Sequence, residues 1–250
     1  MNLQKTGIKL PSGRSQAEAL LEDQLPELIR PFVNEIQADS SSTIADLINR
    51  GELAPNAFLG KTRSLPPALS PDLSSIFAKH TINLTGLGAE LIRHSRPQRI
   101  SAPLVPSSAK DYTGIIVIAD ENLPVHGRST SAHLIPCLFP KIWDSNMNII
   151  FEKNMIDPAI GRSKGLVRYI NRESIYRVAP SAMDEDLVKL VGDKPLIIMA
   201  RGVFGVVPTD PIIDKEDAML ILSSENNRRL LLEGRIAIVL NKEQLRKNIP

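Results

Sequence analysis

The sequence predicts an α+β fold with a central mixed β-sheet, packed helices and a proline-rich N-terminal region. Two apolar runs, 114–119 and 236–240, have the continuous hydrophobicity of strands that are buried on both faces. Elsewhere, apolar residues recur at three- and four-residue steps, which indicates amphipathic helices. Seven of the 19 prolines lie within 55–106. We therefore expect a helical, proline-rich region over 1–106 and an α+β domain over 107–250, with one continuous domain as the alternative.

The N-terminal segment is expected to form a strand and a helix. Leu3–Leu10 has a weak strand pattern, and the turn formers Pro11–Gly13 follow it. A helix should begin at Ser15, where apolar residues start to recur at helical spacing. It should bend at Pro26 and end at Pro31, because proline lacks the amide hydrogen that a helix interior needs.

The rest of the N-terminal region is predicted to contain short elements joined by an irregular chain. A helix over Thr43–Arg50 follows a serine-rich cap and precedes Gly51. Apolar and polar residues alternate over Ile76–Leu84, which is typical of a strand. A short helix should cover Leu87–His94. The proline-containing segment Arg96–Ser108 is the best internal boundary, and we expect it to be a stiff arm.

The C-terminal region has more regular patterns. The turn-forming residues Asp144–Asn146 predict a hairpin between Cys137–Trp143 and Asn148–Glu152. The other expected elements are the buried strand 114–119, a central strand over 195–207, helices that begin at Leu187 and after Asp214, a helix over Glu225–Leu232 that ends at Gly234, and a closing strand over Ile236–Leu240.

Composition excludes several classes of protein. The 30 basic and 28 acidic residues leave a net charge of +2, and the parts before and after Pro106 each carry +1, so we expect no nucleic-acid binding. A single cysteine excludes an intramolecular disulfide and a multi-cysteine metal site, and no cofactor is expected. The sequence contains no run of about 18 apolar residues, so we expect no membrane-spanning helix. The first ten residues also lack the apolar core of a signal peptide.

The polar stretch 120–137 is the first candidate binding segment, and the residues that would contact a ligand or partner there are His126, Arg128 and His133. A metal site would use His126, His133 and Cys137 with Asp120 or Asp144. Those spacings match no familiar zinc signature, so a polar loop satisfied by local hydrogen bonds is the preferred interpretation.

Catalytic patterns are scarce. Cys137 could act as a nucleophile with His133 as its base, but the apolar residues around it predict that it enters a buried strand. The chain contains no Gly-x-Ser-x-Gly elbow, and the sequence Gly86-Leu87-Gly88 lacks the third glycine of a dinucleotide fingerprint. We therefore expect no enzyme and no catalytic residue. An enzyme centred on Asp120, His126 and His133 is the least favoured hypothesis.

The basic segment, residues 161–177, is the second candidate binding segment. It contains five cations and one acid, Glu173, with two interleaved tyrosines. It could bind an anionic partner, but a solvated, charged surface is the preferred interpretation. Its candidate contact residues are Arg162, Lys164, Arg168, Tyr169, Arg172 and Tyr176.

Three ordered pieces of the C-terminal region carry a family resemblance. They are Tyr112–Gly114 with the strand after it, the proline-flanked Pro136–Asp144, and Val191–Leu196 combined with Thr209–Ala218. Together they resemble, over about 112–240, a bacterial, spirochaete-like envelope-protein family associated with flagellar and outer-membrane assembly. The resemblance implies a periplasmic scaffold with no catalytic residue to transfer.

The expected function is that of a non-enzymatic structural or assembly protein of the cell envelope, with association with the flagellum as the narrower expectation. Its expected partners are envelope or flagellar proteins, or a second copy of the chain. The alternative is a periplasmic module that binds a small ligand or polysaccharide through the 120–137 loop and the basic segment. The expected location is the periplasm, with a start that has been trimmed, and the alternative is the cytoplasm.

Overall fold

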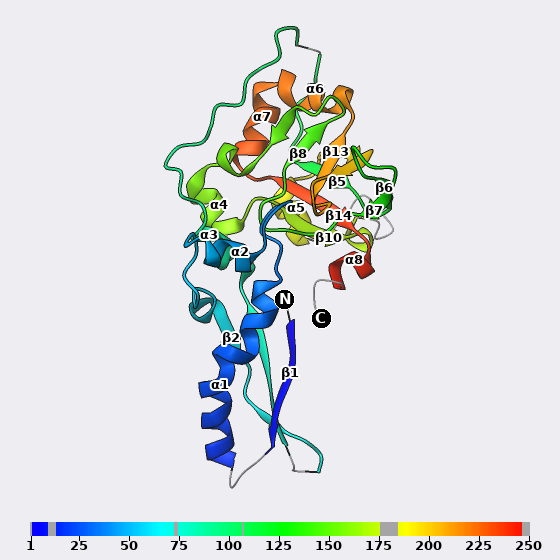
Figure 1. Ribbon diagram of the computed structural model, residues 1–250. Coiled ribbons are helices and arrows are strands. Elements are labelled where there is room, and N and C mark those ends of the chain that lie inside the picture. The colour runs from blue at the N-terminus through cyan, green and yellow to red at the C-terminus, as the bar shows by residue number, and fades with distance from the viewer. Residues whose placement is uncertain (1, 10–13, 73–74, 107, 176–184, 247–250) are drawn as a thin grey trace.

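The computed structural model describes residues 2–9, 14–72, 75–106, 108–175 and 185–246 (Figure 1). The predicted α+β class is confirmed. The α-helices of the described residues are α1 (Arg14–Asn34), α2 (Ile44–Asn49), α3 (Leu84–Ala89), α4 (Pro158–Lys164), α5 (Glu185–Val191), α6 (Lys215–Ser223), α7 (Glu225–Leu232) and α8 (Lys242–Arg246). Short 3-10 helices are η1 (Leu59–Lys61), η2 (Lys153–Met155) and η3 (Arg172–Ser174).

The N-terminal part forms an arm that projects from the rest of the molecule (Figure 1). Its central strand is β4 (Ser75–Ile82), which pairs antiparallel with β1 (Asn2–Lys9) along one edge. Along the other edge β4 pairs with β2 (Thr62–Ser64) and β3 (Ala68–Leu69). Helix α1 packs against β1 and β4. The weak strand pattern near the N-terminus and the alternation over 76–84 therefore both correspond to strands.

The predicted end of α1 at Pro31 is wrong, because the helix continues to Asn34 and contains both prolines. Ile29 and Val33 are buried on the inner side of the last turns, and Glu35 donates its amide hydrogen to the carbonyl oxygen of Pro31 at 3.3 Å. Burial of an apolar face thus offsets the hydrogen bond that each proline lacks.

The sequence predicts both of the short helices that follow, but it places the bounds of α2 more accurately than those of α3. Helix α2 begins after Thr43, which forms a reciprocal capping box with Asp46. Helix α3 begins three residues earlier than predicted, because the Asn83 side chain accepts a hydrogen bond from the Gly86 amide. It also ends at Ala89 instead of at His94.

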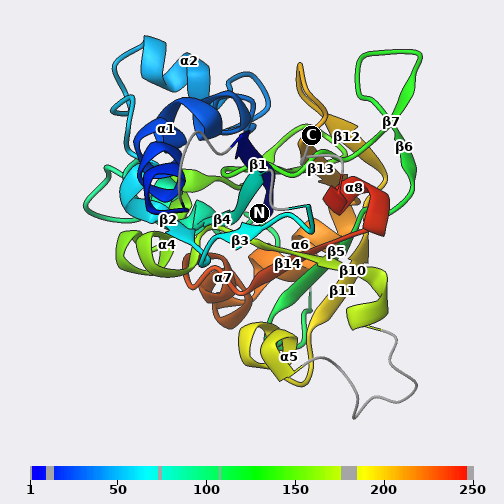
Figure 2. The ribbon, with the colours of Figure 1, turned by 90° about the horizontal axis from the view of Figure 1, so that it is seen from below.

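A four-stranded parallel sheet forms the centre of the C-terminal part, in the order β10 (Arg168–Asn171), β14 (Ile236–Leu240), β5 (Ile115–Ile118) and β11 (Leu196–Met199). Figure 2 shows α5 lying against one side of these strands. On that face Ile116 and Ile118 pack with Leu187 and Val191 of α5. Ile115 and Val117 instead belong to the large core cluster that includes residues of α6 and α7. The continuous apolar runs therefore reflect burial on both faces, as predicted.

A second, mixed sheet has the order β12 (Gly202–Phe204), β13 (Asp210–Ile213), β8 (Ile142–Asp144) and β9 (Ile149–Phe151). The predicted hairpin is confirmed as β8 and β9. The predicted single strand over 195–207 is divided, because Ala200 bonds to Ile118 of one sheet and Arg201 bonds to Ile212 of the other. A separate antiparallel pair, β6 (Asn122–Pro124) and β7 (Ser131–His133), extends to the side of the molecule (Figure 2).

The stretch 137–141, expected to be part of the hairpin, precedes β8 and takes a different role. Leu138 and Phe139 donate their amide hydrogens to the carbonyl oxygens of Gln37 and Ala38, at 3.1 and 2.8 Å. This backbone pairing ties the segment after α1 to the C-terminal part. The large core cluster also contains residues from before and after residue 106, such as Phe58 and Ile156. The division into two domains stays a prediction.

Candidate functional site

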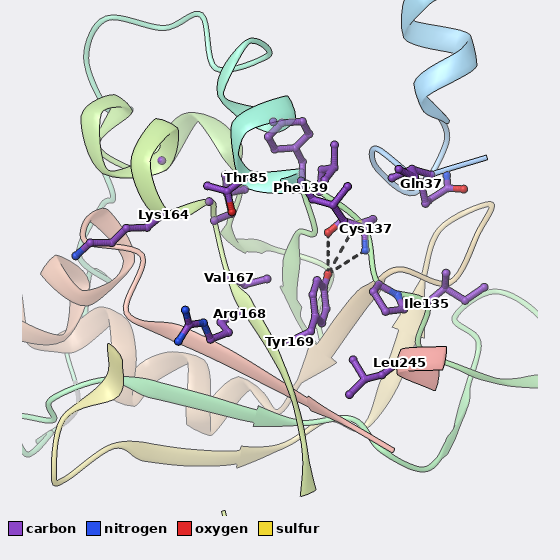
Figure 3. Close-up of a pocket in the computed structure, with 18 of the residues that line it drawn as sticks. Gln37, Thr85, Ile135, Cys137, Phe139, Lys164, Val167, Arg168, Tyr169 and Leu245 are labelled. Carbon is purple, nitrogen blue, oxygen red and sulfur yellow. Dashed lines mark hydrogen bonds between the residues drawn. The ribbon is translucent and has the colours of Figure 1, made fainter. Parts of the chain in front are cut away.

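A groove of about 610 Å³ lies where the N-terminal and C-terminal parts meet (Figure 3). This volume is in the range of small-molecule sites, about 300–1,000 Å³. The walls come from segments that are far apart in the sequence. They include Phe32 in the last turn of α1, Glu35, Ile36 and Gln37 just after it, Leu84 and Thr85 of α3, the stretch 135–139, Lys164 of α4, the run 165–169, and Leu245 of α8.

Tyr169 and Cys137 form the floor of the groove (Figure 3). The Tyr169 hydroxyl accepts a hydrogen bond from the Cys137 amide at 3.1 Å and donates one to the Cys137 carbonyl oxygen at 3.2 Å. Both backbone polar groups of Cys137 are therefore satisfied by one side chain.

The thiol of Cys137 is a poor nucleophile. Burial raises its pKa far above that of an ordinary cysteine, and the carboxylate of Asp210 adds to this shift. Burial also raises the pKa of Tyr169 well above its ordinary value. Both groups are thus neutral near pH 7, and a protonated thiol does not attack an electrophile. The predicted burial of Cys137 is confirmed, although the residue precedes strand β8 instead of lying within a strand.

The four cations of the basic segment that the structure describes do not form one patch. Arg162 donates to the carbonyl oxygens of Ile92 and His94, at 3.0 and 3.2 Å, so it holds the chain that leaves α3. Arg172 contacts the Asp120 carboxylate at 3.0 Å. Lys164 and Arg168 are exposed, both line the groove, and neither forms an ion pair within the ranges that the structure describes.

Among the predicted contact residues of the basic segment, Tyr169 points its hydroxyl inward, where it is bound to the backbone of Cys137. Tyr176 lies outside the described residues. The preferred interpretation of the basic segment, a solvated surface, stays a prediction; Arg162 and Arg172 are exposed as well as bound to structural partners.

The candidate residues of the 120–137 stretch lie apart from the groove lining. Arg128 donates to the carbonyl oxygens of Gly205 and Val206, at 3.3 and 3.2 Å. The His133 ring nitrogen Nδ1 lies 3.2 Å from the carbonyl oxygen of Glu121. His126 contacts the Phe204 ring edge to face, with centroids 6.0 Å apart. The Arg128 and His126 contacts join the β6–β7 hairpin to β12 and the turn after it, which are distant in the sequence, so only the His133 contact is local as expected.

A metal site is not assembled by these residues. No group of three or more histidine, cysteine, aspartate or glutamate side chains with the geometry to hold a metal ion occurs among the described residues. Asp144 instead caps the β8–β9 turn by accepting the amides of Asn146 and Asn148. The Asp120 side chain, with 4% of its surface exposed, is directed to Arg172.

The pairing of Asp120 with Arg172 was not anticipated from the sequence. Asp120 follows β5 and Arg172 follows β10, so the parallel sheet brings both to the carboxyl ends of its strands. Asn241, at the end of β14, also reaches this edge, where its side chain donates to the Asp120 carbonyl oxygen at 3.1 Å. The available signal was that Asp120 and Asn241 each directly follow an apolar run, whereas Arg172 follows the polar residue Asn171 and had no such signal. Nothing in the sequence indicated that α1 and α3 would form walls of a groove.

Among the helices that the structure describes, none has both the length and the apolar character needed to cross a bilayer. The fold and the groove together describe an α+β protein in which the N-terminal part and the C-terminal part each supply walls of one groove. Two family models match successive stretches of the chain. The second domain of Treponema pallidum Tp0624 matches residues 114–242, and the N-terminal domain of the same protein matches residues 1–90.

The first of these matches covers more than half of the chain. The chain therefore belongs to the family of the Tp0624 second domain. The spirochaete part of the expected resemblance is confirmed by both matches. No curated protein shows a significant match to the chain.

Proposed function

We propose that this protein is a non-enzymatic structural or assembly protein of the bacterial cell envelope, located in the periplasm, with flagellar assembly as the narrower setting. The observation that supports this proposal is the open edge of the parallel sheet at strand β11. Among the described residues, β11 pairs with β5 on one side and with no strand on the other.

The backbone of β11 offers hydrogen-bonding groups along this edge. Leu196 and Ala200 donate their amide hydrogens to Gly114 and Ile118, on the β5 side. Backbone groups of successive strand residues point in opposite directions, so the amide and carbonyl groups of Ile197 and Met199 point to the open edge. An extended segment of a partner can pair with these groups and add a strand to the sheet.

The side chains at this edge are apolar as well as exposed. Ile197 retains 53% of its surface and Met199 retains 42%, and Val188 on the adjacent face of α5 retains 37%. A partner strand would cover these side chains while it pairs with the backbone. The partner class is therefore a protein that contributes an extended segment, and a second copy of the chain is one such partner.

The test places a photo-reactive amino acid at position 199 of the full-length protein in the native cells. We expect a specific cross-linked product that disappears when Ile197→Pro removes the outward amide hydrogen. The same probe at Val206, which is 71% exposed on a different turn, is the matched control and should give no product. A protein that is monomeric by sedimentation and gives no cross-link at position 199 would contradict the proposal.

A second candidate function is that of a ligand-binding module, and the groove is the observation that favours it. The groove contains two cations of the predicted basic segment and the end of the predicted 120–137 loop. His126, Arg128 and His133 of the 120–137 loop do not line the groove. Of the predicted contact residues, those that do are Lys164, Arg168 and Tyr169. Saturable binding of a small molecule that raises the melting temperature would support it.

A further inference from the structure

The two most exposed large apolar side chains that the structure describes are neighbours in the segment between α3 and β5. Leu104 is fully exposed, and Val105 retains 81% of its surface. With Pro103 and Pro106 they form the tip, residues 103–106. Figure 1 shows the chain after α3 running along the outside of the molecule and rising beyond α6, at the end opposite the arm. Adjacent apolar side chains at a projecting point are suited to contact with an apolar medium or partner.

The base of this segment is fixed to the body of the molecule. Before the tip, Ile100 packs against the large core cluster. After the tip, the buried side chain of Asn227 in α7 donates to the Lys110 carbonyl oxygen and accepts from the Tyr112 amide, each at 2.9 Å. Between these points, no backbone–backbone hydrogen bond among the described residues involves 101–106. The chain is therefore anchored on both sides of a tip that stays outside the core.

The sequence around the tip is strongly basic. Residues 91–110 contain four lysine or arginine residues and no aspartate or glutamate, in a chain whose net charge is +2. All four cations are exposed, and none forms an ion pair within the parts of the chain that the structure describes: Arg93, Arg96, Arg99 and Lys110. Arg99 and Lys110 lie five and six residues from Leu104, which is at most about 18 and 22 Å of extended chain.

Two acidic residues lie at the base of the segment, on the side of α7. The Asp111 carboxylate accepts hydrogen bonds from the Ser224 hydroxyl and the Asn226 amide group, both at 2.7 Å, and Glu225 lies 3.9 Å from Arg229. Neither acid belongs to the basic stretch 91–110. The charge along the chain on both sides of the tip is therefore positive, which favours an anionic partner.

We propose that the tip inserts Leu104 and Val105 into the surface of an anionic lipid bilayer, while Arg99 and Lys110 contact the phosphates of the headgroups. Hydrocarbon at the boundary of the acyl chains covers the two apolar side chains. The backbone stays at headgroup level, where water satisfies its polar groups. This inference goes beyond the proposed function and needs neither the open edge at β11 nor the groove.

The sequence of the tip favours a lipid surface over a protein partner. A partner strand would pair poorly with it, because Pro103 and Pro106 have no amide hydrogen to donate. A proline-binding groove on a protein contacts only a short piece of an extended ligand. Cations on both sides of the tip instead match a surface that carries negative charge over a wide area.

The experiment measures how the full chain sediments with vesicles of equal parts phosphatidylcholine and phosphatidylglycerol, and with vesicles of phosphatidylcholine alone. We expect binding to the anionic vesicles that is at least about tenfold tighter than binding to the neutral ones. Leu104→Ser/Val105→Ser should weaken binding to the anionic vesicles at least about tenfold, because no apolar side chain then enters the hydrocarbon. Arg99→Gln/Lys110→Gln should weaken it about 25-fold, at about fivefold for each cation.

Each double variant has a matched control. Val206→Ser removes an apolar side chain that is 71% exposed on a different turn. Arg63→Gln/Lys79→Gln removes one exposed arginine and one exposed lysine from the arm. Both controls should bind the anionic vesicles as the wild-type protein does.

A fluorescent label reports insertion directly. Because Cys137 is buried, an environment-sensitive maleimide dye reacts at position 104 of the Leu104→Cys protein. Its emission should shift to the blue on anionic vesicles, whereas the same dye on the Val206→Cys protein should not shift.

The inference is overturned if the anionic vesicles do not bind the protein, if the Leu104→Ser/Val105→Ser protein binds them as the wild type does, or if the label at position 104 shows no shift. If the protein ignores the vesicles and the same variant loses a protein cross-link in the native cells, the tip binds a protein and the inference is wrong. The Leu104→Ser/Val105→Ser protein should keep the cross-link at position 199, so failure at the tip and failure of the proposed function are distinguishable.

Discussion

The substitution Gly114→Ala should strongly destabilise the protein, because Gly114 lies directly against the end of helix α5. A methyl group at position 114 would lie 2.4 Å from the Val191 Cα atom and 2.5 Å from the Val191 carbonyl oxygen. Carbon atoms in ordinary contact are about 3.5–4.0 Å apart. Strand β5 and helix α5 would therefore have to separate by about 1 Å or more.

The expected magnitude follows from what would have to move. Val191 is fully buried, and the atoms in conflict are its backbone Cα and O and its Cβ, none of which is the far end of a flexible side chain. Overpacking a core of this kind costs about 1–3 kcal/mol. The hydrogen bond from the Thr113 hydroxyl to the Val191 carbonyl oxygen, 2.7 Å long, would also be strained, and its loss costs about 1 kcal/mol. We expect the free energy of unfolding to fall by about 3 kcal/mol and the melting temperature by about 6–12 °C.

Urea denaturation followed by circular dichroism measures this difference. Gly60→Ala is the matched control, because a Cβ atom at position 60 meets no atom within 4 Å. Alanine lowers the entropy of the unfolded chain in both variants, so the comparison isolates the steric conflict. A Gly114→Ala protein whose stability lies within about 0.5 kcal/mol of the Gly60→Ala protein would refute the reasoning.

Two further predictions concern the polar groups around the groove and the sheet. Arg172→Ala should lower the free energy of unfolding by about 2 kcal/mol, because it leaves the buried Asp120 carboxylate without its cation, whereas Arg168→Ala should change it by less than about 0.5 kcal/mol. Equal effects of the two substitutions in urea denaturation would contradict this. Burial raises the pKa of the Cys137 thiol, so the folded protein keeps the thiol protonated while the unfolded chain ionises at about pH 8.5. The wild-type protein should therefore lose about 2 kcal/mol of stability between pH 8.5 and pH 10 relative to Cys137→Ala, and parallel pH profiles would show that the thiol is not shielded.

The features that the sequence predicted well are those determined by neighbouring residues. The apolar runs at β5 and β14, the capping pattern at Thr43 and the turn between β8 and β9 all depend on short segments. The burial of Cys137 was predictable for the same reason, because apolar residues and prolines surround it in the sequence.

The features that the sequence did not reveal depend on contacts between distant segments. Pro31 could stay inside α1 because Ile29 and Val33 pack in a core that other segments build. The run 195–207 has one apolar character, but its two halves pair with strands from different sheets. The different roles of Arg168 and Arg172 could not be separated either, since only the folded sheet places Asp120 beside one of them.

The groove depends on both parts of the chain being present together. Gln37 and Ala38 pair through their backbone with Leu138 and Phe139, and this pairing sets the α1 wall against the floor that Tyr169 supports. A cavity built in this way is formed before any ligand arrives, because hydrogen bonds and core packing already fix each wall. The two Tp0624 domain matches occur in the same order along this chain and lie on either side of the same boundary. A protein that kept only residues 114–242 would lose the α1 and α3 walls, so this groove needs both matched parts of the chain.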